Sequence, residues 1–208
     1  MSLFNKISHA HRLLNTIRND YWGLINMPTT DDLDAYLSKY DAESLDLVDA
    51  HALDLGCGSK PSNPFKATNT FGIDIRRNDE KNVKSADLTL EPIPFPDNTF
   101  DYISALDFLE HVPRVIYTPN LKFAFVELMN EVWRTLKQDG IFLSRTPIYP
   151  YATAFRDPTH VNMMTHETFS LYFDDKSRMA AMYGFRGAFV VLSQAIKAPY
   201  LISLLKKA

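Results

Sequence analysis

The sequence predicts an α/β protein built on a mostly parallel β-sheet with helices on both faces. Three observations lead to this prediction: buried strand patterns alternate with helical patterns, two glycines follow the first strand, and an acid ends the second. Successive parallel strands of this kind are joined by right-handed crossovers. We expect a helical N-terminal extension over residues 1–50 and one α/β domain over residues 51–208.

The extension has the residue spacing of two helices. Apolar residues recur at helical intervals over 3–26, and Met27-Pro28 interrupts that pattern. A second helix within 29–40 would take Thr30 or Asp31 as its N-terminal cap.

Five runs rich in apolar residues predict the strands of the sheet. They occupy residues 51–56, 69–75, 82–88, 99–106 and 141–147. Between the fourth and fifth runs, apolar residues over 121–136 mark one face of a long helix, which Gly140 would end. Only a short segment with Pro61 and Pro64 separates the first two runs, so the first crossover helix must be short.

The pattern is less regular beyond residue 147. We expect a helix near 165–173 and a sixth strand within 184–197. The tail over 198–208 fits a strand or a helix equally well.

Composition argues against several classes of protein. The net charge is −3 and the basic residues are scattered, so nucleic acid is not expected as a partner. Cys57 is the single cysteine, which leaves no intramolecular disulfide. The sequence has no apolar run long enough for a transmembrane segment and no secretory apolar core, so we expect a cytoplasmic protein.

The stretch "HALDLGCGSKP" (51–61) places Gly56 and Gly58 just past the first strand. Ligands of open parallel sheets bind beyond the carboxyl ends of the strands, and glycine allows a close approach to the backbone. Asp74 ends the second strand, where an acid can accept hydrogen bonds from both hydroxyls of a ribose. The pattern therefore predicts a nucleoside site.

The same turn disfavours a dinucleotide such as NAD or FAD. Those cofactors require G-x-G-x-x-G at a helix N-terminus, and here the sequence reads G-C-G-S-K-P. A nucleoside that carries an amino acid in place of phosphates fits better. Asp54 could then face its ammonium group.

Four stretches resemble the motifs of class I S-adenosylmethionine-dependent methyltransferases. They are "ALDLGCGSKP" (52–61), "FGIDI" (71–75), "SADLTLEPIPFPDNTFDYISALDFLEHV" (85–112) and "EVWRTLKQDGIFLSRTP" (131–147). The resemblance covers about residues 50–147 and implies a Rossmann-like class I methyltransferase sheet with S-adenosyl-L-methionine as the cofactor. Two departures are Ser59, where a third glycine is frequent, and Gln138-Asp139, where Pro-Gly is usual.

The resemblance also implies which residues bind the cofactor. Around the first turn, the residues beside the methionine moiety would be Asp54, Gly56, Cys57 and Gly58. Asp54 has the alternative role of capping the turn, and we expect Cys57 to be a small turn residue and not a catalytic thiol.

The other implied cofactor residues follow the second, third and fourth strands. Asp74 would bind the ribose and Ile75 would pack on the adenine, unless Asp74 is only a solvated strand end. Asp87 would accept a hydrogen bond from the adenine amino group, or would serve only as a helix N-cap. The remaining residues are Leu88, through its backbone amide, and Ala105 and Leu106, which would border the sulfonium.

A hydroxyl acceptor needs a base that hydrogen-bonds to it. "LDFLEHVPR" offers Asp107, Glu110 and His111, and "AFRDPTHVN" offers Asp157 and His160. We favour His160, with Asp157 orienting its ring, over His111. In the alternative, D-P-T-H is only a rigid turn capped by Asp157.

The loop "RDPTHVN" also resembles one found in methyltransferases of cell-surface sugar pathways, which implies a sugar hydroxyl as the acceptor. Tyr149, Tyr151 and Phe155 could then stack on the sugar, or could simply pack a lid. Tyr21 and Trp22 could close over the ligand. No metal site is expected, because His160, His166 and Asp157 do not have the spacing of a zinc motif.

We therefore predict methyl transfer from S-adenosyl-L-methionine to a small-molecule or glycan acceptor, at oxygen. The alternatives are a protein or RNA methyltransferase and a non-catalytic protein of the same fold that only binds the cofactor. The oligomeric state stays open, and the sequence is compatible with a homodimer.

Overall fold

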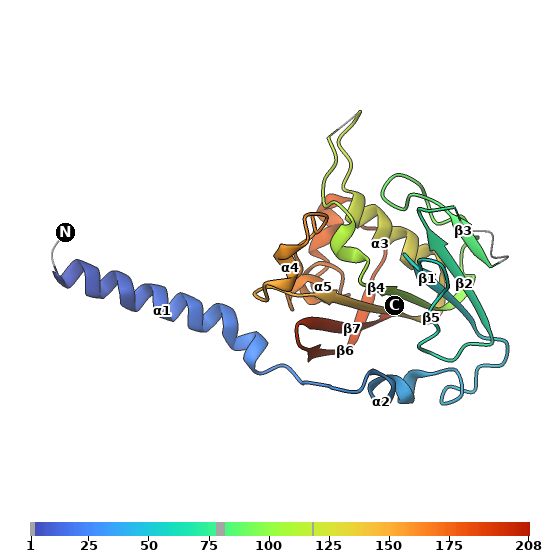
Figure 1. The fold of residues 1–208 in the computed structure, drawn as a ribbon, viewed down its shortest axis with the longest axis horizontal. Coiled ribbons are helices and arrows are strands. Elements are labelled where there is room, and N and C mark those ends of the chain that lie inside the picture. The colour runs from blue at the N-terminus through green and yellow to red at the C-terminus, as the bar shows by residue number, and fades with distance from the viewer. Residues whose placement is uncertain (1–2, 78–81, 118) are drawn as a thin grey trace.

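A computed structural model describes residues 3–77, 82–117 and 119–208 of the chain. Its centre is a seven-stranded sheet with the strand order β3-β2-β1-β4-β5-β7-β6 (Figure 1). The strands are β1 (His51–Leu55), β2 (Asn69–Asp74), β3 (Val83–Ser85), β4 (Phe100–Leu106), β5 (Leu136–Pro147), β6 (Phe189–Lys197) and β7 (Tyr200–Lys207).

Eight helical segments of the described residues connect or flank these strands. The α-helices are α1 (Leu3–Ile25), α2 (Leu33–Leu37), α3 (Ala124–Thr135), α4 (Thr153–Arg156) and α5 (Thr168–Tyr172). The 3-10 helices are η1 (Ser38–Tyr40), η2 (Leu109–His111) and η3 (Met179–Tyr183). None of the described helices is long and apolar enough to cross a membrane.

The sheet is parallel from β3 to β5, and β7 runs antiparallel between β5 and β6. The predicted fold class is thereby confirmed. All five parallel strands deliver their carboxyl ends to one edge, and the loops that follow β1, β2, β3, β4 and β5 meet there.

Alternate residues of the strands pack on opposite faces of the sheet. Leu53, Leu55 and Ile103 join one core with Met129 of α3. Ala52, Tyr102 and Leu143 face the other way and form a second core with Leu37 of α2. Leu37, Ala42 and Ala50, which precede the first strand, are buried in this second core, so the N-terminal extension contacts the sheet. The division of the chain into an extension and a domain at residue 50 stays a prediction.

Two local predictions in the first half of the chain are wrong. The crossover from β1 to β2 contains no helix and runs as turns. Pro61 and Pro64 have no backbone N–H to donate, which disfavours a helix in so short a segment. The cap of α2 is Asp32, whose Oδ1 accepts a hydrogen bond from the Ala35 amide at 3.1 Å, because the helix begins at Leu33.

Gly140 does not end α3, which is a further correction. The helix ends at Thr135, and Leu136 already pairs with Phe100 as the first residue of β5. The pairing then resumes between Ile141 and Tyr102, so 137–140 form a bulge in the strand. Leu136 is fully buried, and its burial draws the chain into the sheet four residues before the glycine.

The C-terminal tail is a strand. β7 inserts between β5 and β6, and its residues from Leu201 to Leu205 are all buried. Strand β6 begins at Phe189, later than the start of the predicted stretch.

Helix α1 extends away from the rest of the molecule (Figure 1). Its C-terminal end touches the α/β domain: the Tyr21 hydroxyl lies 3.0 Å from the Tyr149 hydroxyl, and Leu24 packs on a small core around Ile148. The predicted helix over 3–26 is confirmed by the bounds of α1.

Candidate active site

The turn after β1 allows close approach to its backbone. Gly56 and Gly58 have φ values of +69° and +65°, in the left-handed region that glycine adopts without strain. A Cβ atom on Gly56 would lie 2.5 Å from the ring of Phe108. Only glycine therefore lets the segment after β4 close on this turn.

Asp74 ends β2, and its carboxylate accepts hydrogen bonds from two residues. The Gly58 amide donates to Oδ2 at 2.8 Å and the Arg76 amide donates to Oδ1 at 2.9 Å. The Arg76 guanidinium donates to Oδ1 from Nε at 2.8 Å and to Oδ2 from Nη2 at 3.2 Å. The Arg76 side chain and these amides lower the pKa of Asp74 to about 2, so the group is a carboxylate at neutral pH.

Arg76 occupies the positions where a ribose would bind. Each Asp74 oxygen already accepts two hydrogen bonds, which uses its lone pairs. A ribose diol donates to the same two atoms, so the guanidinium must turn away when a ribose is bound. The Arg76 side chain is 74% exposed and free to rotate into solvent.

A cavity of about 360 Å³ opens beside the Asp74 carboxylate, a volume suited to a nucleoside. The predicted cofactor residues that line it are Gly56, Asp74, Ile75, Asp87 and Leu88. Residues that the sequence did not identify as cofactor ligands also line it: Ile73, Arg76, Ala86, Thr89, Asp107, Phe108, His111 and Val112.

The side chains of Ile75 and Asp87 both line the cavity. Ile75 is exposed and offers an apolar surface to the cavity. Asp87 caps the turn after β3, because its Oδ1 accepts from the Thr89 amide at 3.0 Å. It therefore has the capping role and a place in the cavity wall at once.

Asp54 is buried below the turn and does not line this cavity. Its Oδ1 accepts from the Ser104 hydroxyl at 2.7 Å and its Oδ2 from the Ser62 amide at 2.8 Å. Burial raises the pKa of Asp54. These contacts tie β1 to β4 and to the crossover, so the carboxylate supports the turn from beneath.

Cys57 also lies away from the cavity lining, with its sulfur against β2. A Cβ atom on Gly72 would stand 2.5 Å from Cys57 Sγ. Burial, together with the charges of Asp54 and Asp74, raises the pKa of Cys57 to about 11. The thiol is therefore protonated at neutral pH and is a poor nucleophile.

Gly58, Ala105 and Leu106, the remaining predicted cofactor residues, do not line the cavity. Gly58 contributes its amide to Asp74 and does not itself line the cavity. Ala105 is fully buried in the core that contains α3, and Leu106 packs on the opposite core. The next two residues, Asp107 and Phe108, reach the cavity in their place.

His111 and His160 meet at the rim of the cavity. His111 ends η2 and lines the cavity wall. The ring of His160 packs against it edge to face, with 4.9 Å between the centroids.

Asp157 contacts His111 through Thr159 and lies at ion-pair distance from His160. The Thr159 hydroxyl donates to Asp157 Oδ1 at 2.7 Å and contacts His111 Nδ1 at 3.0 Å. By contrast, Asp157 Oδ2 lies 4.0 Å from His160 Nε2, and His160 Nδ1 lies 3.3 Å from the Ala154 carbonyl. Asp157 makes no direct hydrogen bond to either ring, and the role of orienting His160 stays a prediction.

Glu110 lies beneath the two histidines and is only 2% exposed. The Thr146 hydroxyl of β5 donates to its Oε2 at 3.0 Å. Its backbone carbonyl accepts from the Val161 and Asn162 amides at 2.8 and 3.0 Å. Burial raises the pKa of Glu110. The residue joins the loops that follow β4 and β5.

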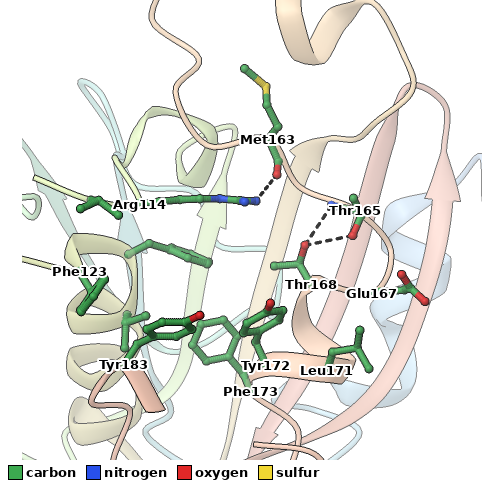
Figure 2. Close-up of a pocket in the computed structure, with 13 residues that line it drawn as sticks. Arg114, Phe123, Met163, Thr165, Glu167, Thr168, Leu171, Tyr172, Phe173 and Tyr183 are labelled. Carbon is green, nitrogen blue, oxygen red and sulfur yellow. Dashed lines mark hydrogen bonds between the residues drawn. The ribbon is translucent and has the colours of Figure 1, made fainter. Parts of the chain in front are cut away.

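A larger cavity, of about 580 Å³, begins at Arg114, three residues past His111. Figure 2 shows the rings of Tyr172, Phe173 and Tyr183 grouped on one side of it, with Arg114 reaching across toward Met163. The Arg114 guanidinium donates to the Met163 carbonyl and, at 2.7 Å, to Asn162 Oδ1. These contacts join the segment after β4 to the loop that carries His160.

Arg76 and Phe108 line the cavity but were not predicted from the sequence, and only Arg76 has a recognisable sequence pattern. Arg76 follows Asp74 by two positions, and a basic residue so close to a strand-end acid indicates an ion pair. Phe108 leaves no such signal for its contact with Gly56, because the two are brought together by the pairing of β1 with β4.

Comparisons with known proteins agree with this geometry. Residues 53–144 match a family model described as a methyltransferase domain. A search of curated protein sequences finds no match.

Many solved structures share the fold at low sequence identity. An S-adenosylmethionine-dependent methyltransferase from Clostridium acetobutylicum is 13% identical, with a TM-score of 0.53 and 99% of each chain covered. One from Archaeoglobus fulgidus is 17% identical, with a TM-score of 0.51, covering 85% of this chain and 93% of that one.

The [4+2]-cyclase SpnF is also 17% identical, with a TM-score of 0.54, covering 85% of this chain and 80% of its own. At these identities the likeness shows the fold alone. The domain match over 53–144 includes the glycine turn, Asp74, Asp87 and the His111 segment, and the cavity beside Asp74 suits the nucleoside of the cofactor. Residues 53–144 therefore form a methyltransferase domain, for which S-adenosyl-L-methionine is the cofactor that the match implies.

Proposed function

We propose that the protein transfers a methyl group to a hydroxyl oxygen of a small-molecule or glycan acceptor. The observation that carries this proposal is the pair His111 and His160 at the rim of the cofactor cavity. An imidazole is a base suited to neutral pH, and a hydroxyl acceptor has a proton to lose.

We propose that the predicted cofactor residues divide into those that touch the ligand and those that support them. Gly56, Asp74, Ile75, Asp87 and Leu88 would line the nucleoside. The supporting group would be Asp54, Cys57, Gly58, Ala105 and Leu106.

S-adenosyl-L-methionine supplies a methyl group already activated by its positive sulfur. Held beside Gly56, Asp74 and Asp87, the cofactor would give this methyl group to the acceptor oxygen and would be left as the neutral thioether. The hydroxyl proton passes to an imidazole nitrogen of the His111–His160 pair. The chain's main contribution is to hold the oxygen in line and to exclude water.

A sugar acceptor is supported by the aromatic residues beside His160. Phe155 and Tyr149 are both exposed, and their rings lie 6.2 Å apart. Phe155 follows Ala154, whose carbonyl contacts His160. Exposed rings at this place offer a stacking surface for the apolar face of a sugar.

The test uses S-adenosyl-L-methionine labelled on its methyl group. The purified protein is incubated with extract of the cells that encode it, and label is counted in small-molecule, lipid-linked glycan, protein and nucleic-acid fractions. We expect label in the small-molecule or glycan fraction, above a heat-killed control. Label in protein or RNA would assign the alternative acceptors. Cofactor binding without transfer to any fraction would instead indicate a non-catalytic binding protein.

His160→Ala should slow the transfer without weakening cofactor binding, because His160 is absent from the cavity lining. His166→Ala is the matched control, since His166 lies under α1 against Gly23. Equal rates in both variants would remove His160 from the mechanism.

We also propose that the protein forms a homodimer through α1. Ile7, Ala10, Leu14, Tyr21 and Leu24 recur at intervals of three, four, seven and three residues, the spacing of a coiled-coil seam. Ile7 and Leu14 are exposed by 60% and 66% on the projecting helix. A second copy would cover the projecting part of this stripe, from Ile7 to Leu14, with the same part of its own helix, because Tyr21 and Leu24 already contact the α/β domain.

We propose a cytoplasmic location for the protein. The lone thiol of Cys57 forms no disulfide, in keeping with a reducing compartment.

A further inference from the structure

Glu110 is a buried carboxylate without a cationic partner among the described residues. It is 2% exposed, and none of the ion pairs found in the described part of the chain includes it. The Thr146 hydroxyl donates to Oε2, and the residue's own backbone amide also donates to the carboxylate, so both of these donors are neutral. A buried carboxylate is ordinarily paired with a cation or bound to a metal, because leaving it alone in a poorly hydrated place is costly.

Two imidazoles complete a group of three metal-binding side chains. One nitrogen of His111, one nitrogen of His160 and one oxygen of Glu110 all lie within 4.8 Å of one another. Two histidines with one carboxylate form a ligand set for Zn²⁺ or Fe²⁺ that leaves coordination positions open. Donor atoms around such an ion stand about 3–3.5 Å apart at these bond lengths, so a small inward shift of the exposed His111 side chain would close the set.

The hydrogen bonds of both rings determine which nitrogen carries the lone pair. The Thr159 hydroxyl has one proton and donates it to Asp157, so it accepts from His111 Nδ1–H. The Ala154 carbonyl only accepts, so His160 Nδ1 is the donor there. In the neutral state both rings therefore carry the lone pair on Nε2.

This arrangement is the one that orients histidine ligands in metal sites. A ligating imidazole usually donates its other N–H to a carboxylate or a backbone carbonyl, which sets the tautomer and the ring angle. His160 has the carbonyl of Ala154, and His111 reaches the carboxylate of Asp157 through Thr159. Asp157 therefore helps to orient the His111 ring through Thr159.

We propose that Glu110, His111 and His160 bind one divalent transition-metal ion at the rim of the cofactor cavity. The proposal rests on the proposed function for its role: an open coordination position beside His111 would hold the acceptor hydroxyl, since His111 lines the cavity. Coordination would withdraw electrons from the oxygen and ease loss of its proton. With a metal bound, the proton would pass to solvent water and not to the imidazoles, because Nε2 of each ring holds the metal and Nδ1 donates to its own partner. Sequence spacing does not reveal the set, because His160 joins the Glu110-His111 pair only through the loop after β5.

The probe is Co²⁺, whose visible absorption reports ligand number and geometry. Full-length protein is freed of metal with a chelator and titrated with Co²⁺. We expect one equivalent to bind, with a d–d spectrum typical of nitrogen and oxygen ligands. His160→Ala and Glu110→Gln should each weaken Co²⁺ binding by at least about 10-fold. His166→Ala, the matched histidine control, should leave binding unchanged.

Cofactor affinity, measured by calorimetry in each variant, reports whether the fold is intact. If Glu110→Gln fails to fold, His160→Ala still tests the site, because His160 lies on a loop. Absence of Co²⁺ binding by the wild type would overturn the proposal, as would unchanged binding in His160→Ala. Binding that disappears only in His9→Ala or His11→Ala would assign the metal to α1 and also overturn it.

The same measurements separate this site from the proposed function. Methyl transfer that persists after chelation, with no Co²⁺ bound, would remove the metal and leave the methyltransferase. One equivalent of Co²⁺ held by these ligands, with no label transferred to any fraction, would support the metal site and contradict the proposed acceptor chemistry.

Discussion

At the scale of single residues, the cofactor site depends on one carboxylate and on the arginine that covers it. Asp74 is held ionised by Arg76 and by two backbone amides, with a pKa lowered to about 2. The contacts that lower its pKa also fill the oxygens to which a ribose must donate. If Asp74 binds the ribose as proposed, cofactor binding exchanges the exposed Arg76 guanidinium for two hydroxyls.

The two residues should consequently respond to substitution in opposite directions. Asp74→Ala removes the acceptor of both ribose hydroxyls and should weaken cofactor binding by about 1–3 kcal/mol. Arg76→Ala should leave the affinity unchanged or raise it by a few fold, because an ion pair with so exposed an arginine contributes less than about 1 kcal/mol. Calorimetry with S-adenosyl-L-methionine measures both, with the exposed Arg77→Ala as the control. If Arg76→Ala weakened binding as much as Asp74→Ala, Arg76 would be a direct cofactor ligand.

At the scale of elements, the first crossover shows how a segment without a helix is held in place. The Asn63 side chain makes two hydrogen bonds to the backbone of Ala67. Its Oδ1 accepts from the Ala67 amide at 2.9 Å, and its Nδ2 donates to the Ala67 carbonyl at 2.8 Å. Phe65 is fully buried and stacks on Tyr102 of β4, with 4.3 Å between the ring centroids. The crossover is thus attached to the sheet by one aromatic residue and a few side-chain contacts.

Phe65→Ala should therefore destabilise the whole domain and not only the loop. Loss of a fully buried phenylalanine ring costs about 3–5 kcal/mol, since the cavity left behind cannot fully collapse. Urea denaturation followed by circular dichroism measures the change. The control is Val48→Ala, at a side chain that is 90% exposed and should shift stability by less than about 0.5 kcal/mol. A small effect of Phe65→Ala would show that the crossover is not anchored by this ring.

At the scale of the whole molecule, α1 projects from the domain with apolar side chains exposed to solvent. An isolated amphipathic helix gains most of its stability by burying its apolar face. At the C-terminal end of α1, Tyr21 and Leu24 of this face contact the α/β domain. The exposed Ile7 and Leu14 are therefore the residues on which assembly should depend.

We expect the full-length protein to be a dimer in solution and Leu14→Lys to convert it into a monomer. A charge in an apolar seam must lose its hydration when the helices pair, which opposes association. Light scattering coupled to size exclusion gives the mass of each species. His9→Lys adds the same charge outside the stripe and should remain dimeric. A monomeric wild type, or a dimer in both variants, would place the interface elsewhere or remove it.

Local patterns were enough to predict much of this protein. The positions of the strands along the chain and the glycine turn depend on neighbouring residues, so periodicity and turn chemistry reveal them. The placement of Asp74 at the end of β2 follows in the same way. The tail was ambiguous because β7 is buried on both faces and shows no alternation. The prediction that Gly140 ends α3 was wrong because the burial of Leu136 in the sheet outweighed the local helix-stop signal of the glycine.

The acceptor side was decided only by the tertiary structure. Glu110 and His111 are adjacent in sequence, but His160 reaches them because β4 and β5 pair and their loops leave the sheet side by side. In the same way Phe108 meets Gly56 across the β1–β4 pair. Contacts between residues so distant in the chain depend on strand pairing and loop packing, which no short stretch of sequence encodes. The cofactor end could therefore be predicted from local motifs, whereas the cluster of two histidines and a buried carboxylate appeared only when the sheet was assembled.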